Sequence, residues 1–175
     1  MFSDPQKNVA QMGLTPGMRI ADLGAGSGFY ALEAARAVGD SGRVYAIDIQ
    51  KDLLAKLRNK AREEHLGNIE VIWADLEHVG GTRIQDGAVH GVIVSNILFQ
   101  IQNKDNVCQE IKRILRPRGL VYLVDWADSF GGLGPHGSQI VTEKSARELF
   151  LKNGFTIAKS MAAGDHHYGL VFEKK

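Results

Sequence analysis

The chain has 175 residues, of which 44% are hydrophobic and 23% charged, with a formal net charge of +1. This balance is typical of a globular protein, and the length favours a single domain over residues 1–175. A nearly neutral chain lacks the strong basic character of most nucleic-acid-binding domains, so the composition gives no strong signal for an RNA or DNA partner. The single cysteine, Cys108, excludes an internal disulfide, and we expect it to be buried on a helix.

The sequence has no basic and apolar leader and no apolar run of about 18 residues. We therefore predict a cytoplasmic protein with no membrane partner. Near the N-terminus, Pro5 precedes Val9, Ala10 and Met12, and proline is favoured in the first turn of a helix. This pattern predicts a short helix within residues 2–12. The segment 1–15 would cover either the edge of the sheet or a ligand, and the sequence leaves both positions open.

Apolar runs then alternate with segments whose apolar residues recur every three or four positions. Continuous apolar runs are typical of strands in a covered parallel sheet, and the three-to-four spacing is typical of helices. Phe29, Leu32 and Ala35 are expected to face inward from one such helix. The expected strands are 18–23, 43–49, 69–74, 89–95, 119–126, 155–161 and 168–173, and the expected helices are 28–39, 52–65, 104–115 and 142–153.

Strands that alternate with helices predict a parallel sheet with right-handed crossovers. The last two strands have no helix between them, so they should pair as an antiparallel hairpin. We therefore expect an α/β fold with a doubly wound, mostly parallel sheet of seven strands and a C-terminal antiparallel hairpin. A glycine-rich loop at 129–137 should follow the fifth strand directly.

The first strand leads into a loop with glycine at 24, 26 and 28. Alternate glycines allow a tight turn and leave room for a ligand, and the helix that follows presents free amides to that ligand. The dinucleotide fingerprint G-x-G-x-x-G is not met, because bulky Phe29 replaces its last small residue. Asp22 also repels a pyrophosphate but suits a ligand that carries an ammonium group. A nicotinamide cofactor is therefore disfavoured.

The segment 22–28, DLGAGSG, resembles the D/E-x-G-x-G-x-G loop of the class I S-adenosylmethionine-dependent methyltransferases. S-adenosylmethionine carries both an ammonium and a sulfonium group. The seven expected strands with a final hairpin extend this resemblance over nearly the whole chain. The resemblance implies a Rossmann-like methyltransferase fold and S-adenosylmethionine as the cofactor.

In open α/β sheets the ligand lies across the carboxyl ends of the strands. Asp48 ends the second strand, where an acid can accept both ribose hydroxyls, as it does in nicotinamide enzymes too. The resemblance implies that Asp75 bonds the adenine amino group and that Ser95 and Asn96 lie near the methionine part. The predicted cofactor-binding residues are Asp22, Gly24, Ala25, Gly26, Ser27, Gly28, Phe29, Asp48, Ile49, Ala74, Asp75, Leu76, Ser95 and Asn96.

Methyl transfer from a sulfonium depends mainly on alignment of donor and acceptor, and it needs a general base only when the acceptor proton has a high pKa. The residues after the fourth strand, SNILF at 95–99, lack the proline pair of enzymes that methylate base amines, so they resemble the small-molecule branch. Of the acceptor-side residues, Tyr30, His166 and His167 are catalytic candidates. A solvated hairpin is the alternative for the histidines, and no third ligand has metal-site spacing. The acceptor-side candidates are Tyr30, Phe99, Trp126, His136, His166, His167 and Tyr168.

The sequence therefore predicts S-adenosylmethionine-dependent methyl transfer to a small-molecule acceptor by in-line displacement. Two alternatives stay open. One is a methyltransferase that acts on RNA or protein, and the other is a non-catalytic, cofactor-binding subunit of a larger complex. A homodimer is compatible with this short chain, because a partner could supply walls of the pocket.

Overall fold

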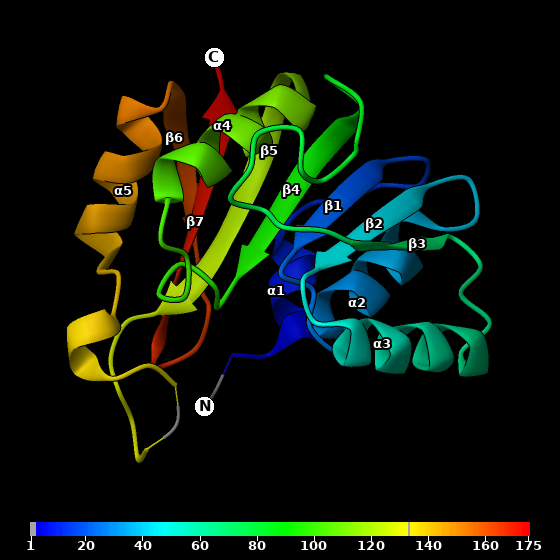
Figure 1. Ribbon diagram of the computed structural model, residues 1–175, viewed down its shortest axis with the longest axis horizontal. Coiled ribbons are helices and arrows are strands. Elements are labelled where there is room, and N and C mark those ends of the chain that lie inside the picture. The colour runs from blue at the N-terminus through cyan, green and yellow to red at the C-terminus, as the bar shows by residue number, and fades with distance from the viewer. Residues whose placement is uncertain (1–2, 133) are drawn as a thin grey trace.

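The computed structural model describes residues 3–132 and 134–175. Seven strands form one sheet in the order β3-β2-β1-β4-β5-β7-β6 (Figure 1). Phe2, in the predicted first helix, and Leu133, in the predicted glycine-rich loop, lie outside the described residues. The elements are α1 Pro5–Gln11, β1 Arg19–Leu23, α2 Phe29–Val38, β2 Arg43–Asp48, α3 Lys51–Glu63, β3 Ile69–Trp73, β4 Val89–Ser95, α4 Lys104–Ile114, β5 Leu115–Trp126, the short 3-10 helix η1 Gly137–Gln139, α5 Glu143–Lys152, β6 Phe155–Met161 and β7 His167–Lys174.

Strands β1 to β5 run parallel, and β7 pairs antiparallel with both β5 and β6. The predicted doubly wound sheet and its C-terminal hairpin are therefore confirmed. Because β7 inserts between β5 and β6, the last strand in sequence is not the last in space. The five parallel strands bring their carboxyl ends to one edge of the sheet, which is where this type of fold binds ligands.

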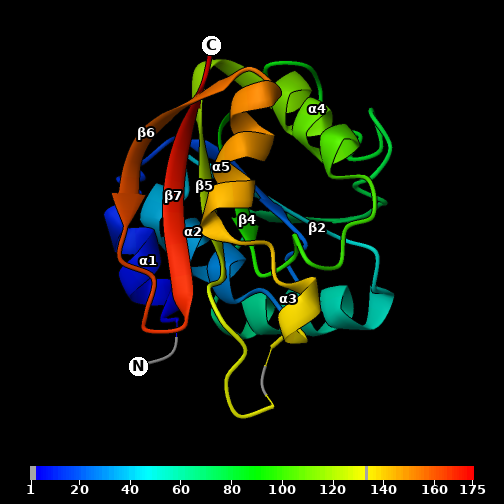
Figure 2. The same ribbon diagram turned by 90° about the vertical axis from the view of Figure 1, so that its left-hand side faces the viewer.

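Helices cover both faces of the sheet (Figure 2). Helices α1, α2 and α3 contribute Val9, Tyr30 and Leu57 to an apolar cluster that also contains alternate strand residues such as Ile20. The neighbouring strand residues point to the opposite face, where they pack against α4 and α5. Burial on both faces explains the continuous apolar strands, and each fully buried large side chain contributes roughly 1.5–3 kcal/mol.

The predicted N-terminal helix is confirmed as α1. Asp4 caps it by accepting hydrogen bonds from the backbone amides of Gln6 and Lys7, at 3.1 and 3.3 Å, and Pro5 is its first residue. Farther along, Cys108 is 1% exposed on α4, as expected. Within residues 3–132 and 134–175, no helix is long and apolar enough to cross a membrane.

Two local expectations are wrong. Phe29 was expected on the buried face of its helix, but it is the first helical residue and its side chain is 61% exposed. The fifth strand was expected to begin at Gly119, but β5 begins at Leu115 because that residue already pairs with Val89 of β4. The following Arg116 precedes a proline, which favours an extended backbone over a helical one. The preceding helix, α4, accordingly ends at Ile114.

Candidate functional site

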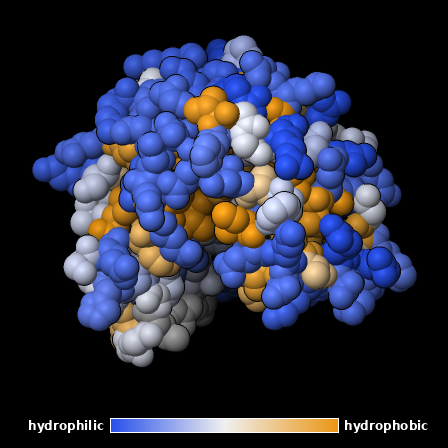
Figure 3. Space-filling view, viewed as in Figure 1, coloured by the Kyte–Doolittle hydropathy of each residue, from blue (hydrophilic) through white to orange (hydrophobic). Residues whose placement is uncertain are grey.

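The carboxyl ends of β1 to β4 border a cavity of about 380 Å³, which we call the strand-end cavity. In Figure 3, apolar side chains gather across the middle of this face of the molecule, within a largely hydrophilic surround. The residues that line the strand-end cavity are Gly24, Gly26, Asp48, Ile49, Gln50, Leu53, Ala74, Asp75, Leu76, Glu77, Ser95, Asn96, Ile97, Gln100 and Ile101.

Two glycines of the loop after β1 serve different purposes. Gly26 has φ +54°, and a β-carbon added there would meet no atom within 4 Å, so its backbone faces open space beside the cavity. Its N–H donates to Asp48 Oδ2 at 2.9 Å. At Gly28, an added β-carbon would lie 2.5 Å from Leu57 Cγ, so this glycine admits the close approach of α3. Gly26 therefore leaves room for a ligand, whereas Gly28 is required for packing.

The strand-end cavity is acidic. Asp48, Asp75 and Glu77 line it, and no Lys, Arg or His does. Asp48 is only 7% exposed, and its Oδ1 accepts a hydrogen bond from the backbone N–H of Gln50 at 2.8 Å. Asp75 Oδ1 accepts from the backbone N–H of Glu77 at 2.9 Å. His78, which does not line the cavity, has its Nδ1 3.1 Å from Asp75 Oδ2. Three carboxylates with no cation among the lining residues attract hydrogen-bond donors and positive charge, and they oppose a phosphate or pyrophosphate group.

Asn96 borders this cavity and a second one. Its backbone has φ +55°, which is unusual for a residue with a β-carbon, and its N–H donates to the Val124 carbonyl at 2.9 Å. Its side-chain Oδ1 is buried and has no hydrogen-bond partner within the described ranges. Strained backbone and an unpaired buried acceptor both cost free energy, and both are typical of ligand sites. The Asn96 oxygen is thus available to a donor on a ligand.

The second cavity, of about 520 Å³, lies beside the first residues of α1, and we call it the α1 cavity. It shares Gly26, Leu53, Ser95 and Asn96 with the strand-end cavity, so the two adjoin. Among the described residues, its lining carries no charged side chain, in contrast to the strand-end cavity. The residues that line the α1 cavity are Ser3, Pro5, Ala25, Gly26, Ser27, Phe29, Tyr30, Leu53, Ser95 and Asn96.

The loop between β3 and β4 forms the wall of the strand-end cavity through Ala74–Glu77, and α4 holds it in place. Glu77 accepts hydrogen bonds from the backbone amides of Gln102 and Asn103, at 3.2 and 2.6 Å, which ties the loop to the start of α4. Glu110 on α4 is fully buried and accepts from the backbone amides of Gly80 and Thr82, at 2.6 and 3.2 Å. The carboxylates of Glu77 and Glu110 therefore hold the loop between β3 and β4 against α4.

Asp125 organises the segment after β4. It is 2% exposed, and its two oxygens accept from the backbone amides of Leu98 and Trp126, at 3.0 and 2.8 Å. Burial raises the pKa of Asp125 to about 6, although these backbone amides act in the opposite direction. The Asp125 contacts fix the turn that carries Ser95 and Asn96 into both cavities.

A family model described as a methyltransferase domain matches residues 14–164. The chain belongs to the class I S-adenosylmethionine-dependent methyltransferases. This methyltransferase is similar over its full fold to the crystal structure of an S-adenosylmethionine-dependent methyltransferase from Aquifex aeolicus. That pair has a TM-score of 0.90 and 24% sequence identity, over 99% of this chain and 91% of that chain.

Curated relatives match a smaller region. The chain is 30% identical over 112 residues to an arsenite methyltransferase of Halobacterium salinarum. These residues are 64% of this chain and 28% of that protein. It is also 30% identical over 116 residues to the ubiquinone/menaquinone biosynthesis C-methyltransferase UbiE of Vibrio parahaemolyticus. These residues are 66% of this chain and 44% of that protein. The matched region is thus less than half the length of these two relatives.

Twelve of the fourteen residues predicted to bind the cofactor line one of the two cavities of this methyltransferase, and Asp22 and Gly28 are the exceptions. Asp22 lies behind the loop, is 1% exposed and has no hydrogen bond of good geometry to either oxygen within the described chain. Burial raises its pKa to about 7; the nearby Ala31 amide opposes this effect and Asp48 adds to it. Asp22 therefore lies buried behind the loop and lines neither cavity.

The three catalytic candidates differ in accessibility. The Tyr30 hydroxyl accepts from Asn8 Nδ2 at 2.7 Å and lies 3.1 Å from Ser3 Oγ, so it fastens α1 to α2 at the edge of the α1 cavity. His167 is 8% exposed, its ring contacts that of Trp126 at a tilt of 38° with centres 4.3 Å apart, and burial lowers its pKa. His166 Nδ1 lies 2.8 Å from Asp128 Oδ1, so of the two histidines it is the one placed beside a carboxylate.

The other acceptor-side candidates line neither cavity, and the same holds for His166 and His167. Tyr168 is 6% exposed and donates its hydroxyl to the Val141 carbonyl at 2.9 Å, so it is a packing residue. Trp126 makes a tilted ring contact with His167, His136 is exposed at the start of η1, and Phe99 is half-buried. No group of three or more His, Cys, Asp or Glu residues in the described chain could hold a metal ion.

Sequence reasoning missed several lining residues, including Gln50, Glu77, Gln100 and Ile101. Each follows a predicted strand end or a predicted site residue by only a few positions. Proximity along the chain to Asp48, Asp75 and Asn96 was the signal that could have found them. Ser3 and Pro5 carry no such signal, because they reach the α1 cavity only through the packing of α1 on α2.

Proposed function

We propose that this methyltransferase transfers the methyl group of S-adenosylmethionine to a neutral small molecule. The observation that carries the proposal is the pairing of an acidic cavity without a cation and an adjoining cavity without any charge. The acidic cavity suits a cofactor rich in hydrogen-bond donors with a positive sulfur and an ammonium group. It does not suit the pyrophosphate of a dinucleotide.

The residues present fit S-adenosylmethionine by the chemistry of their donors and acceptors. Asp48, held by the amides of Gly26 and Gln50, would accept from the ribose hydroxyls. Asp75 would accept from the adenine amino group, with apolar Ile49 and Ile101 on the walls around the ring. The unpaired Oδ1 of Asn96 would accept from the methionine ammonium. When bound, the cofactor supplies an activated methyl group on sulfur, with a neutral thioether as leaving group.

The acceptor class is inferred from the α1 cavity. Its lining of aromatic, glycine and hydroxyl residues supports a neutral, partly apolar molecule, since a charged acceptor would lose its hydration there without a partner. Among the named relatives, the C-methyltransferase of quinone biosynthesis is closer to this chemistry than the arsenite enzyme. Cys108 is buried on α4 and its pKa is raised to about 12 by burial, so it offers no thiolate to arsenic at neutral pH.

The chain contributes alignment more than acid–base chemistry. The Asn96 turn, fixed by Asp125, and the Gly26 loop hold the two cavities side by side, and apolar Leu53 lies between them. If the acceptor carries a proton of high pKa, we propose that His166 accepts it. Asp128, 2.8 Å away, would orient the imidazole.

The experiment is a thermal shift with S-adenosylhomocysteine and NAD in parallel, followed by a methyl-transfer assay on neutral phenols, quinols and amines. A ligand at about 100 times its dissociation constant adds roughly 2.7 kcal/mol, which should raise the melting temperature by about 5–10 °C. A shift with S-adenosylhomocysteine alone, together with turnover, supports the proposal. A shift without turnover on any acceptor favours a cofactor-binding subunit, and a shift with NAD alone contradicts the proposed cofactor.

A further inference from the structure

One edge of the sheet is unprotected. Within residues 3–132 and 134–175, strand β3 pairs only with β2, so half of its backbone groups point away from the sheet. The ladder begins with the Val44 amide on the Asn68 carbonyl and ends with the Ala74 amide on the Asp48 carbonyl. By alternation, the backbone N–H and C=O groups of Ile69, Val71 and Trp73 point outward. These groups are free to pair with an added strand.

The opposite edge is blocked in three ways. Strand β6 has a register shift between Ile157 and Lys159 where it pairs with β7. Lys159 places a charge in the middle of the edge, and its Nζ donates to the Gln11 carbonyl of α1 at 2.9 Å. A bulge, a lysine and a covering segment are the devices that prevent strand addition. Strand β3, with the sequence IEVIW, contains neither a lysine nor a proline, and its pairing with β2 has no bulge. Its one charged residue, Glu70, lies 3.6 Å from Arg43 of β2.

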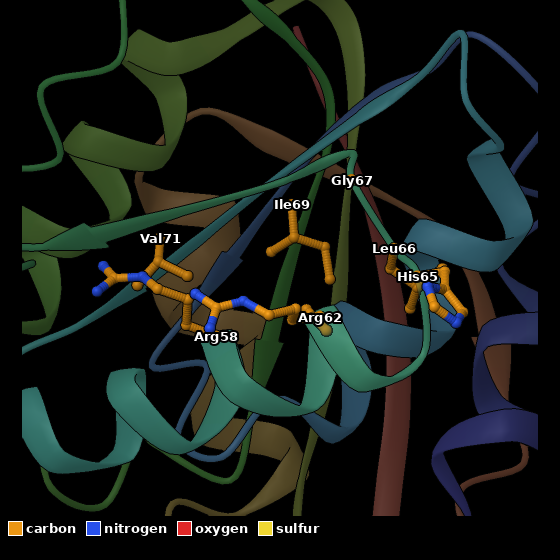
Figure 4. A pocket seen from close by; sticks show the side chains of 8 residues that line it. Arg58, Arg62, His65, Leu66, Gly67, Ile69 and Val71 are labelled. Carbon is orange, nitrogen blue, oxygen red and sulfur yellow. The ribbon is translucent and has the colours of Figure 1, made fainter.

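A groove of about 540 Å³ runs between β3 and the outer side of α3. Figure 4 shows Arg58 and Arg62 of α3 beneath Ile69 and Val71 of β3, with His65 at the end of the helix. The groove thus has an apolar floor and a cationic rim. Within the described residues, neither Arg58 nor Arg62 forms an ion pair.

The charge of the rim selects the occupant. A second copy of the chain could pair antiparallel through β3 about a two-fold axis, which would keep both α3 helices on the same face of the joined sheet. Arg58 and Arg62 of one copy would then face the same arginines of the other, and like charges repel. An acidic segment of a different protein meets no such repulsion.

We propose that an extended acidic segment of a partner protein adds to β3 as an eighth strand. Its backbone would bond the outward groups of Val71, and its glutamate or aspartate side chains would contact Arg58 and Arg62. Main-chain pairing supplies affinity in this mode of recognition, and the side chains in the groove supply specificity. The proposal does not rest on the methyl-transfer function.

The test uses the full chain and a fluorescent heptapeptide of alternating glutamate and valine, with a lysine–valine peptide as its charge-reversed counterpart. We expect the acidic peptide to bind, and hydrogen exchange of the Val71 amide to slow at least tenfold in the complex. Val71→Pro should abolish binding while the fold is retained, because proline is tolerated on an edge strand where the lost N–H faces solvent. Circular dichroism checks the fold of this variant.

Arg58→Glu combined with Arg62→Glu should weaken binding at least tenfold. The matched control, Lys144→Glu combined with Lys175→Glu, changes net charge equally at exposed positions away from the groove and should bind normally. No binding of the acidic peptide, equal binding of both peptides, or binding that survives both the proline and the arginine variants would overturn the proposal. Protection of the Val71 amide by raised protein concentration alone would assign the edge to self-association instead.

Discussion

Replacing Glu110 with glutamine should destabilise this protein more than any other single isosteric change to a carboxylate. Glu110 is fully buried on α4, and its oxygens accept from Arg113 Nε and Nη2 at 2.8 and 2.7 Å. They also accept from the Gly80 amide and from the Thr82 hydroxyl, at 2.6 and 2.5 Å. Glutamine keeps the shape, but it removes the charge and turns one acceptor into a donor that faces other donors.

The pKa of Glu110 sets the scale of the effect. Burial alone would raise this pKa, but the hydrogen bonds from Arg113, Thr82 and Gly80 together lower it to about 2 from the usual 4.5. A shift of this size corresponds to about 3 kcal/mol of stability for the charged form, and breaking a buried pair costs about 3–5 kcal/mol. For a chain of this length, the melting temperature should fall by roughly 10 °C.

Urea unfolding at several pH values measures this effect. A lowered carboxyl pKa contributes stability that is complete above about pH 4.5 and is lost as the pH falls towards 2. The difference in free energy of unfolding between the native protein and Glu110→Gln should therefore be largest at pH 7 and should shrink as the pH falls from about 4.5 towards 2. Glu143→Gln, which breaks the exposed pair with Arg147, is the control and should cost no more than about 1 kcal/mol.

Glu110 should also affect the cofactor site at a distance, because it holds the loop that carries Asp75 and Glu77 into the strand-end cavity. Below its melting temperature, Glu110→Gln should bind S-adenosylhomocysteine more weakly, whereas Glu143→Gln should not. If Glu110→Gln lowers the free energy of unfolding by less than about 1 kcal/mol at pH 7, or by an amount that does not change with pH, the buried Glu110–Arg113 pair does not stabilise the protein as argued. Unchanged affinity would refute the positioning role alone.

Three further changes test the site. Asp48→Ala should weaken the binding of S-adenosylhomocysteine by about 1.5–3 kcal/mol, because charge-assisted hydrogen bonds are lost. The control Asp40→Ala, at an exposed position, should bind normally. Equal affinities of the two variants in calorimetry would contradict the proposed position of the cofactor. Asp22→Asn should stabilise the protein at pH 8 and not at pH 4. The pKa of Asp22 is raised in the native state, so the native protein loses stability as the pH rises from about 4 to 7, and the asparagine variant does not. A gain in the free energy of unfolding in urea that does not depend on pH would contradict this reason. Tyr30→Phe should cost about 1–2 kcal/mol of stability while kcat stays near native, because one N–H of buried Asn8 Nδ2 loses its acceptor and only the bond to Ser3 Oγ remains. Loss of turnover without loss of stability would instead make Tyr30 catalytic.

The fold class and most residues that border the strand-end cavity could be predicted from the sequence because both depend on local pattern. Continuous apolar runs that alternate with amphipathic segments predict a parallel sheet, and parallel strands necessarily bring their carboxyl ends to one edge. Asp48, Asp75 and Asn96 follow three different strands, so their convergence on one cavity required no knowledge of loop conformation. Phe29 in place of the last small residue of the fingerprint, together with Asp22, then argued against a dinucleotide.

Residues whose role depends on contacts between distant segments could not be predicted. The Tyr30 hydroxyl was a catalytic candidate by chemistry, and only the docking of α1 reveals its bond to Asn8. In the sequence, Glu110 is one residue of an ordinary amphipathic helix, and only the structure shows that the Gly80 and Thr82 amides donate to it. Phe29 was placed inward by helical periodicity, which does not hold for the first residue of a helix beside a ligand loop.

The amino-acid sequence by itself determined which residues could meet at the carboxyl edge of the sheet, because side-chain periodicity and strand direction are properties of neighbouring residues. Only the tertiary structure decided which carboxylates are buried, which hydroxyls are already bonded and which edge of the sheet is left open. Those outcomes depend on β7 inserting beside β5 and on α4 holding a loop from the other end of the sheet. Burial and hydrogen bonding across such distances arise from packing, and local sequence pattern does not encode them.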